Sequence, residues 1–350
     1  AGAVMTRPSA LNLRVGSAVA LPVHLRSLLW ALLLAAALLL TVVATLSLGK
    51  LGIPLTDVAD VLTGNASPVH MFVLHRLSGP RVTVAIGVGA ALGMAGALFQ
   101  SVTRNPLGSP DVIGVNWGAS AGAALVALAF PGTVPVPLGA LLGAVAAVLT
   151  VATVTGTGLR HPGRLVVAGI GVAAMSAAFT QFVVAALARD QASVLAAYVN
   201  GTLSARSWEH AATIWLVVAL AVPLLAALAQ PVALTEMGDE LADSLGARAT
   251  RTRTAAITLS VVLAAGAVSV AGPIAFVSLT APQIARRLTR LAGPNLVVSA
   301  LVGALILALA DLAVQHFPFT DGLPVGIATL AVGGIYLGFL LVREWRRGAL

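Results

Sequence analysis

Apolar stretches about as long as a membrane-spanning helix recur along this chain, and they restrict its fold more than any other feature. A helix that crosses a bilayer needs about 20 predominantly apolar residues. Ten such segments can be distinguished, near residues 28–48, 81–102, 112–130, 136–156, 164–188, 209–229, 254–272, 274–288, 295–315 and 324–342. The weakest division lies at Gly272-Pro273, where no polar loop intervenes. The sequence therefore predicts an all-α polytopic membrane protein with ten transmembrane helices.

The composition agrees with this fold class. Hydrophobic residues make up 59% of the 350 residues and charged residues only 9%, whereas a soluble domain carries about a quarter charged residues. The net charge of +8 comes from loop arginines, so it does not indicate nucleic-acid binding. Because the chain has no cysteine, disulfides, thiol chemistry and cysteine-ligated metals are excluded. We expect a flexible cytoplasmic tail over residues 1–27 and a single transmembrane domain over residues 28–345.

The distribution of basic residues predicts the orientation of the chain. With ten spans, 15 of the 20 Lys and Arg residues fall on the side of both termini, and the other side receives Lys50, Arg76, Arg81, Arg189 and Arg206. Short loops rich in Lys and Arg stay in the cytosol. Both termini and residues 231–253 are therefore predicted to be cytosolic, in a multi-pass protein of the inner or plasma membrane.

Residues 231–253 form a polar, charged segment in an otherwise apolar chain. Within it, a predicted helix over residues 234–246 has an apolar stripe at helical spacing: Leu234, Met237, Leu241 and Leu245. Acidic residues repeat at the same steps beside it: Glu236, Asp239, Glu240 and Asp243. Gly246 can end the helix in a left-handed cap. A membrane-surface helix is the simplest alternative, but it would usually carry Lys or Arg on its polar face. The acidic face instead favours docking on a protein partner.

Several spans are not plain helices. The second contains small residues that allow another helix to approach closely in lipid: Gly89, Gly93 and Gly96. It is followed by RNPLGSPDVIG, in which Pro106 and Pro110 stop helix propagation. A similar break recurs as AGPIAFVSLTAPQIAR, from Ala271 to Arg286, and includes Gly272 and Pro273. Interrupted segments in matching places predict two structural repeats. The second and seventh spans lie five apart and therefore cross the membrane in opposite directions, so the repeats are predicted to be inverted.

Asp311 is the one clearly ionisable residue well inside a predicted span, with Gln315 one turn further on. An acid within the membrane is a candidate proton relay, but it can equally form a structural bond to a neighbour. The chain has no series of Asp, Glu or His for ion coupling and no GxxxxGK[ST] loop for a nucleotide. If transport is driven, we expect another polypeptide to supply the energy.

Four ordered motifs give the chain a resemblance to the FecCD family. They are RNPLGSPDVIG after a glycine-rich span with Gln100, LTEMGDELADSLGA, GPIAFVSLTAPQIARRL, and ADLAVQHFPFTDGLPVGIATLAVGGIYLGFLLVRE. The resemblance covers roughly residues 70–345. Members of this family are membrane subunits of type II ABC importers for iron-siderophore complexes, haem and vitamin B12. It implies a ten-helix FecCD-type permease that pairs with a second permease subunit, two ATPases and an extracytoplasmic binding protein. It also implies no catalytic residue, cofactor or metal in the chain itself.

The resemblance also implies roles for particular residues. The family's coupling helix corresponds to Glu236, Met237, Gly238, Asp239, Leu241, Ala242, Leu245 and Gly246. Two arginines that meet acidic residues of the binding protein correspond to Arg76 and Arg81, with Ser78-Gly79 widening their spacing. We assign the pore and its helix breaks to Gly89, Gly93, Gly96, Gln100, Asn105, Pro106, Pro110, Gly272 and Pro273. Where the family often has a third arginine this chain has Gln315, which fits a heterodimer whose other subunit carries more docking charge.

The sequence therefore predicts the permease subunit of an ABC importer for a ferric siderophore, with a catecholate favoured, and not an enzyme. A haem or cobalamin importer is the alternative within the same class. An ion-coupled secondary transporter that uses Asp311 is the alternative from another class, and a channel is a third. ATP dependence separates the ABC importer from the last two.

Overall fold

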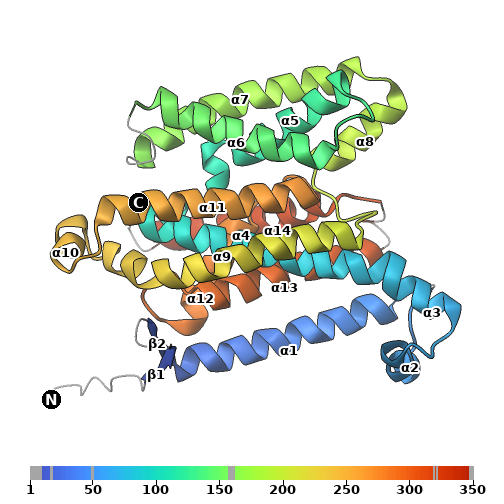
Figure 1. Ribbon diagram of the computed structural model, residues 1–350, viewed down its shortest axis with the longest axis horizontal. Coiled ribbons are helices and arrows are strands. Elements are labelled where there is room, and N and C mark those ends of the chain that lie inside the picture. Colours follow the sequence, from blue (N-terminus) through green and yellow to red (C-terminus); the bar gives the residue numbers. More distant parts are fainter. Residues whose placement is uncertain are drawn as a thin grey trace.

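The computed structural model describes residues 10–15, 19–48, 51–156, 162–317, 320 and 322–346, and most of these residues are helical (Figure 1). The long helices are α1 (Leu25–Ser47), α4 (Ser78–Thr103), α6 (Val136–Val154), α7 (Pro162–Ala186), α9 (Trp208–Thr235), α11 (Ala249–Ala271), α13 (Leu296–His316) and α14 (Val325–Arg346). The shorter helices are α2 (Val58–Thr63), α3 (Pro68–Phe72), α5 (Val115–Ala129), α8 (Arg189–Val199), α10 (Asp239–Ser244) and α12 (Val277–Thr289). The 3₁₀ turns are η1 (Leu55–Asp57) and η3 (Pro110–Ile113), and η2 (Val73–Leu77) is a π-helical turn.

Each of the ten predicted spans corresponds to a helix in the described part of the chain. Seven helices there are long and apolar enough to cross a membrane, while α5 and residues 325–338 of α14 are shorter apolar helices. Helix α12 has only 13 residues and carries Arg286 and Arg287 in its last turn. The all-α polytopic fold is thus confirmed, whereas ten as the number of crossings stays a prediction.

The boundaries of the elements differ from the expected ones in three places. Strands β1 (Ala10–Val15) and β2 (Val19–His24) pair as an antiparallel hairpin where a tail over residues 1–27 is predicted, and α1 already begins at Leu25. The loop before the second span is helical from Pro68 onward. The break after α11 runs from Gly272 to Phe276, so α12 begins at Val277. Gly272 has a φ of 75°, and a Cβ there would collide with the carbonyl of Tyr198.

Helix α4 forms the centre of the molecule. It packs against α13, α11 and α9, and in Figure 1 α5, α6, α7 and α8 form a layer on one side while α1 lies on the other. In the most apolar stretch of residues 68–103, which includes α4, 89% of the residues are buried. The corresponding stretches of α1 and of α7 are each 17% buried. The outer helices therefore present most of their side chains to lipid or to a partner subunit.

Glycines allow the close packing around α4. A Cβ on Gly89 or Gly93 would collide with backbone atoms of α13, at Gly303 and Ser299 respectively. A Cβ on Gly96 would collide with the carbonyl of Ser278 on α12. Because lipid offers no hydrophobic drive for helices to associate, close backbone approach provides the van der Waals contact that holds them together.

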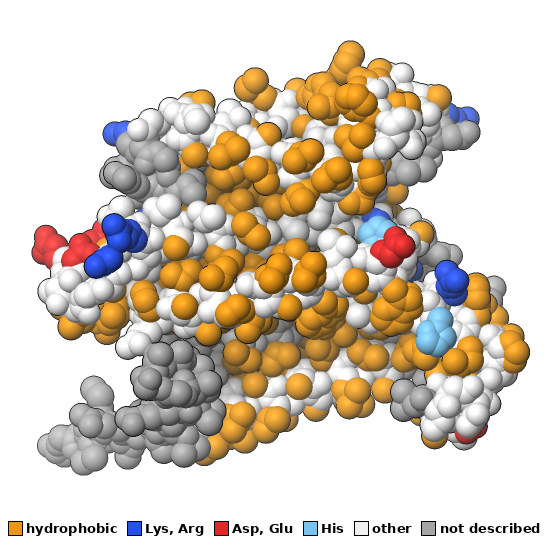
Figure 2. Space-filling view, viewed as in Figure 1, with side chains coloured by type: hydrophobic (Ala, Val, Ile, Leu, Met, Phe, Trp, Pro, Cys, Tyr) orange, Lys and Arg blue, Asp and Glu red, His pale blue; other side chains and the backbone are white. Residues whose placement is uncertain are grey.

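The two ends of the helix bundle carry most of the charge. The hairpin and α10 lie at one end, and α2 and α3 lie at the other (Figure 1). Figure 2 shows acidic and basic side chains gathered at the α10 end, while the faces of the helices between the two ends are largely hydrophobic. This distribution matches a bundle whose middle lies in hydrocarbon.

Candidate functional site

The predicted docking helix over residues 234–246 is split into two helices. Helix α9 continues to Thr235, the chain turns through residues 236–238, and α10 comprises only Asp239–Ser244. A single helix is therefore the wrong prediction, because Gly238 adopts a φ of 115° that interrupts the helical backbone. Gly246 has a φ of 83° and follows the end of α10, as its predicted cap role requires.

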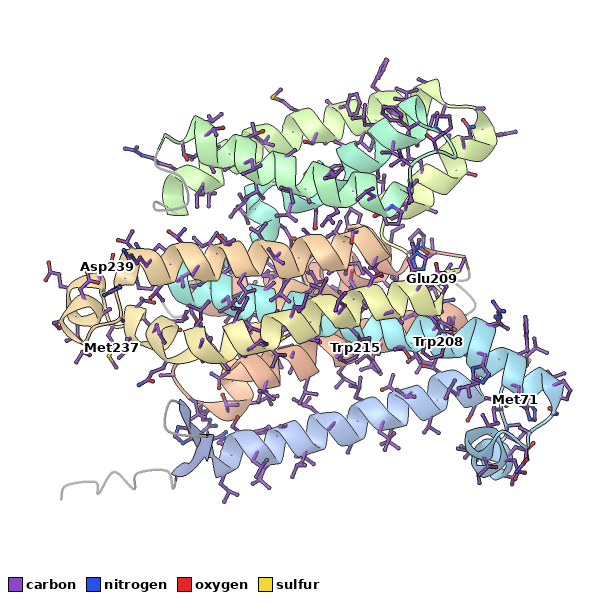
Figure 3. All side chains as sticks on the ribbon, in the orientation of Figure 1. Met71, Trp208, Glu209, Trp215, Met237 and Asp239 are labelled. Atoms are coloured by element: carbon purple, nitrogen blue, oxygen red, sulfur yellow. The ribbon has the colours of Figure 1, made fainter. Side chains whose placement is uncertain are left out.

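Three apolar side chains of this segment face outward: Met237 is 65% exposed, Leu241 47% and Leu245 57%. We call them the docking surface, and Figure 3 shows Met237 at the α10 end of the bundle. Leu234, the fourth member of the predicted stripe, instead packs in a small cluster with Ala242, Ala247 and Ala249. That cluster attaches α10 to the ends of α9 and α11, so the docking surface rests on a supported helix.

The acidic residues of the predicted outward stripe also bind partners within the chain. The carboxylate of Asp239 accepts hydrogen bonds from Arg253 Nη2 at 2.7 and 2.9 Å and from Arg104 Nη2 at 2.9 Å. The hydrogen bond from Arg253 holds the pKa of Asp239 below its ordinary value, and the charge of Arg104 adds to this. Asp239 thus joins α10 to the end of α4 and to α11.

Two further acids also accept hydrogen bonds from other residues of the chain. Glu236 accepts hydrogen bonds from Arg286 Nη2 at 3.3 Å and from the backbone N–H of Gly293 at 3.0 Å. Asp243 accepts one from the backbone N–H of Ala249 at 2.6 Å. Glu240 alone of the four acids has no such bond among the described residues. Three of the four acids therefore help to anchor this segment, while Glu240 and Asp243 are exposed and the side chain of Asp239 is 43% exposed.

Helix α12 is tied to the end of α4 and to the loop that follows it. Gln100 Nε2 donates to the carbonyl of Leu279 at 2.9 Å. Gln283 Nε2 donates to Gln100 Oε1 and to the carbonyl of Pro106, both at 2.8 Å. Arg286 Nη2 also donates to Ser101 Oγ at 3.0 Å. Helix α12 therefore lies beside the end of α4 and the loop that contains Pro106.

The other predicted break residues occupy the same joint or the opposite end. Asn105 Oδ1 accepts from the N–H of Leu107 at 2.9 Å and closes a turn, and Pro110 is buried in the first turn of η3. Asp111, next in η3, accepts from Ser278 Oγ of α12 at 2.9 Å. Gly272 and Pro273 lie away from this joint, against Tyr198 and Gly201.

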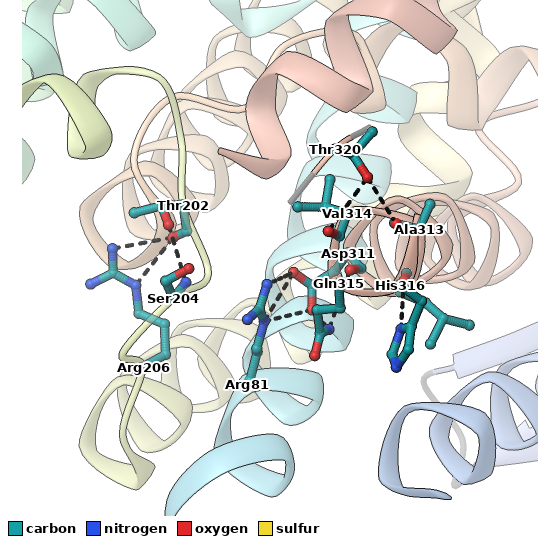
Figure 4. Close-up of polar contacts among 11 residues, drawn as sticks. Arg81, Thr202, Ser204, Arg206, Asp311, Ala313, Val314, Gln315, His316 and Thr320 are labelled. Carbon is teal, nitrogen blue, oxygen red and sulfur yellow. Dashed lines mark hydrogen bonds and ion pairs between the residues drawn. The ribbon is translucent and has the colours of Figure 1, made fainter. Parts of the chain in front are cut away.

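Asp311 is held by an ion pair with Arg81 (Figure 4). The guanidinium donates from Nε at 3.1 and 2.9 Å to the two carboxylate oxygens and from Nη2 at 2.7 Å to Oδ1. Gln315 Nε2 donates to Oδ2 at 2.8 Å. The Asp311 residue is 1% exposed, so the carboxylate is removed from water and satisfied by these two side chains.

Of the two arginines predicted to dock a binding protein, Arg81 is thus engaged inside the chain. Its side chain is 21% exposed, against a cavity of about 430 Å³ that Gln315 and His316 also line. Arg76 is exposed and has no hydrogen bond or ion pair among the described residues. Because Nε and Nη2 of Arg81 already bind Asp311 and Arg76 is exposed, Arg76 is the better placed of the two for docking.

Four residues of these networks were not singled out by sequence reasoning: Arg104, Arg253, Gln283 and Arg286. The sequence places the arginines only among cytosolic charges, and their partners lie far away along the chain. One sequence feature could have predicted these ion pairs: acids occur in residues 236–243, and arginines occur at the ends of three spans. Among the described residues no group of three or more His, Cys, Asp or Glu could hold a metal ion.

Comparison with known proteins agrees with the arrangement. The family model described as the FecCD transport family matches residues 32–343. The ferric enterobactin transport system permease protein FepG of Escherichia coli is 37% identical over 324 residues, which are 92% of this chain and 98% of that protein. The Fe(3+)-citrate import system permease protein YfmE of Bacillus subtilis is 35% identical over 328 residues, 92% of this chain and 97% of the other.

A solved structure shares the fold. It is a metal-chelate type ABC transporter in an inward-facing conformation, with a TM-score of 0.79, 23% identity, and coverage of 89% of this chain and 98% of that one. The sequence motifs predict similarity to the second ferric-enterobactin permease subunit, and the match to FepG confirms it. The helical fold and the matched residues together show that this chain belongs to the FecCD transport family.

Proposed function

We propose that this chain is the permease subunit of an ATP-driven importer for a ferric siderophore, with a catecholate chelate favoured. FepG, whose name refers to ferric enterobactin, is similar along nearly its whole length, and relatives named for ferric citrate are similar as well. A haem or cobalamin importer is the alternative within the class. The chain supplies the membrane path and performs no catalysis.

The docking surface is the observation that best supports this proposal. Met237, Leu241 and Leu245 project from α10 and the turns on either side of it, and ion pairs of Asp239 and Glu236 anchor this segment to α4, α11 and α12. Exposed apolar groups on a supported, polar end of a membrane protein are typical of a protein–protein contact. Because the chain has no nucleotide-binding loop, an ATP-driven importer would need a separate ATPase, and we assign the docking surface to that contact. By the positive-inside rule this end and both termini face the cytosol.

The complete importer would contain a second, similar permease subunit, two ATPases and an extracytoplasmic binding protein. The two permeases would form a heterodimer, since Gln315 stands where an additional docking arginine is common in the family. Arg76, exposed at the opposite end from α10, would meet acidic groups of the binding protein. Such a contact would mainly raise the association rate.

An ion-coupled carrier would need Asp311 to gain and lose a proton during transport. The carboxylate is buried and held by charge-assisted bonds from Arg81, which favours a structural role. The test is purification of the chain with its neighbouring gene products and uptake of a ferric tris-catecholate into vesicles. Uptake that needs ATP and survives a protonophore at clamped ATP is expected. Uptake that follows the proton gradient and ignores ATP would overturn the proposal.

A further inference from the structure

A second cavity, of about 300 Å³, lies between α5, α7, α8, α14 and the break before α12. Its lining holds amide, hydroxyl and apolar groups and no titratable side chain. The polar residues that line it are Asn116, Ser120, Thr180, Gln181 and Asn200. Pro273, which the sequence assigns to the pore, lines it too. This volume is roughly that of ten water molecules and lies at the lower limit of pockets that take a drug-sized molecule.

Part of the hydrogen-bonding capacity of this lining is already used. Ser120 Oγ donates to the carbonyl of Asn116 at 3.0 Å, and Thr180 Oγ1 donates to the carbonyl of Ser176 at 2.7 Å. Asn200 Nδ2 donates to the carbonyl of Ala196 at 2.7 Å. The two hydroxyl oxygens keep their lone pairs and can still accept.

Asn116 is the residue that most clearly lacks a partner. It is only 9% exposed, lines the cavity, and its Oδ1 is buried without a hydrogen bond among the described residues. Gln181, across the cavity on α7, is exposed and also forms no hydrogen bond within the described part of the chain. A buried amide without a partner is unfavourable, so a group that bonds to it gains free energy on entering.

The chemistry of the lining restricts what that group can be. Neutral amides and hydroxyls can donate to carbonyls and accept from N–H and O–H groups. An anion that entered would lose its hydration, and no Lys, Arg or His of the lining would compensate it. The cavity therefore favours an uncharged, hydrogen-bonding group over a charged one.

We propose that this cavity is a subsite for the uncharged backbone of the transported chelate, with its amide, ester or hydroxyl groups, while the anionic iron centre stays outside. The inference rests on the proposed importer function, and it assigns Asn116 and Gln181 as the residues that bind this part of the substrate. Specificity at this step would then come from the backbone of the chelate and not from its charge.

The test uses the complete transporter in vesicles and measures ATP-driven uptake of a ferric tris-catecholate with an amide-containing backbone. Asn116→Leu keeps the size but removes both amide functions, and Gln181→Met does the same at an exposed position that tolerates change. Each should lower the uptake rate by about tenfold. Thr213→Val is the control, since it also replaces a polar side chain by an apolar one but lies on α9, outside the cavity. It should keep the wild-type rate.

Two charged variants determine which part of the chelate enters the cavity. With the uncharged backbone there, Gln181→Lys and Gln181→Glu should lower uptake by similar factors, because each removes the same amide. If the anionic centre enters instead, Gln181→Lys would raise uptake and Gln181→Glu would lower it, and the inference would be overturned. Wild-type uptake by Gln181→Met would also overturn it. In either case ATP-driven uptake by the wild-type transporter would leave the proposed function intact.

Discussion

Arg81 of α4 and Asp311 of α13 are 230 positions apart in the chain, and their side chains form a forked ion pair at 2.7–3.1 Å. Such charge-assisted, two-nitrogen contacts are stronger than neutral hydrogen bonds and fix the orientation of both groups. Asp311 is nearly inaccessible to water, whereas the Arg81 side chain keeps 21% exposure. The pair is therefore asymmetric, because Asp311 depends on Arg81 and Gln315 for its hydrogen bonds, whereas the Arg81 guanidinium keeps access to water.

This asymmetry predicts unequal effects of the two single variants. Arg81→Gln leaves a buried carboxylate uncompensated and should cost about 3–5 kcal/mol of stability. Asp311→Asn should cost less, about 1–3 kcal/mol, because water can still reach the guanidinium. The double variant should be less destabilised than the sum of the two. Unfolding of the purified transporter in detergent measures all three, with the exposed Arg76→Gln as the control. Equal, additive effects of both single variants would contradict the asymmetry.

Transport by Asp311→Asn tests the function class directly. The amide keeps the size of the side chain and part of its hydrogen-bonding capacity, so uptake should fall only modestly. A carboxylate that must titrate cannot be replaced in this way, and a proton-coupled carrier would lose uptake altogether. Vesicles loaded with ATP, with and without a protonophore, distinguish the two outcomes. Complete loss under both conditions would favour the ion-coupled carrier.

Charge on the docking surface should uncouple the ATPase. In Met237→Asp or Leu241→Asp, a carboxylate replaces an apolar group that the partner would cover, and desolvating it is unfavourable. Substrate-stimulated ATP hydrolysis should drop by about tenfold or more, while insertion into the membrane is unchanged. Glu240→Gln, on the exposed side of the same helix, should retain stimulation. Normal stimulation in the two aspartate variants would show that the ATPase contacts another surface.

The anchor of α10 should weaken in acid. The pKa of Asp239 is lowered by the hydrogen bond from Arg253, so the folded state favours the ionised carboxylate. Its contribution to stability is present above the ordinary aspartate range near pH ~4 and is lost as the pH falls through the lowered pKa. Unfolding midpoints measured from about pH 5 down to about pH 2 should therefore depend on pH less in Asp239→Asn than in the wild type. An identical pH dependence would remove Asp239 from the anchor.

A methyl group at Gly96 should separate α4 from α12. The added Cβ would collide with the carbonyl of Ser278, and overpacking of this kind costs about 1–3 kcal/mol. The matched control is Gly171→Ala on α7, where an added Cβ meets nothing within 4 Å. That change should be neutral or stabilising by up to about 1 kcal/mol, because alanine favours the helix. Thermal unfolding compares the two, and equal midpoints would argue against the close approach at Gly96.

The sequence by itself determined the features that depend on local pattern. The apolar runs predict the helices, because a lipid-embedded backbone must satisfy its hydrogen bonds within each segment. The left-handed turn at Gly246 and the small-residue face of α4 follow from residue type alone. Pro106 and Pro110 likewise mark the loop after α4, since proline cannot continue a helix.

Only the tertiary structure decided how polar side chains are used. The periodicity of Glu236 and Asp239 predicts an acidic stripe but could not show that both acids bind arginines from other helices. Arg81 has the position of a docking residue, yet Asp311 occupies its guanidinium. The amide-lined cavity arises from four helices and a break that no local pattern connects. A charged or polar group in a low-dielectric interior is stabilised by whichever partner lies within about 3 Å, and that partner is set by how distant helices pack.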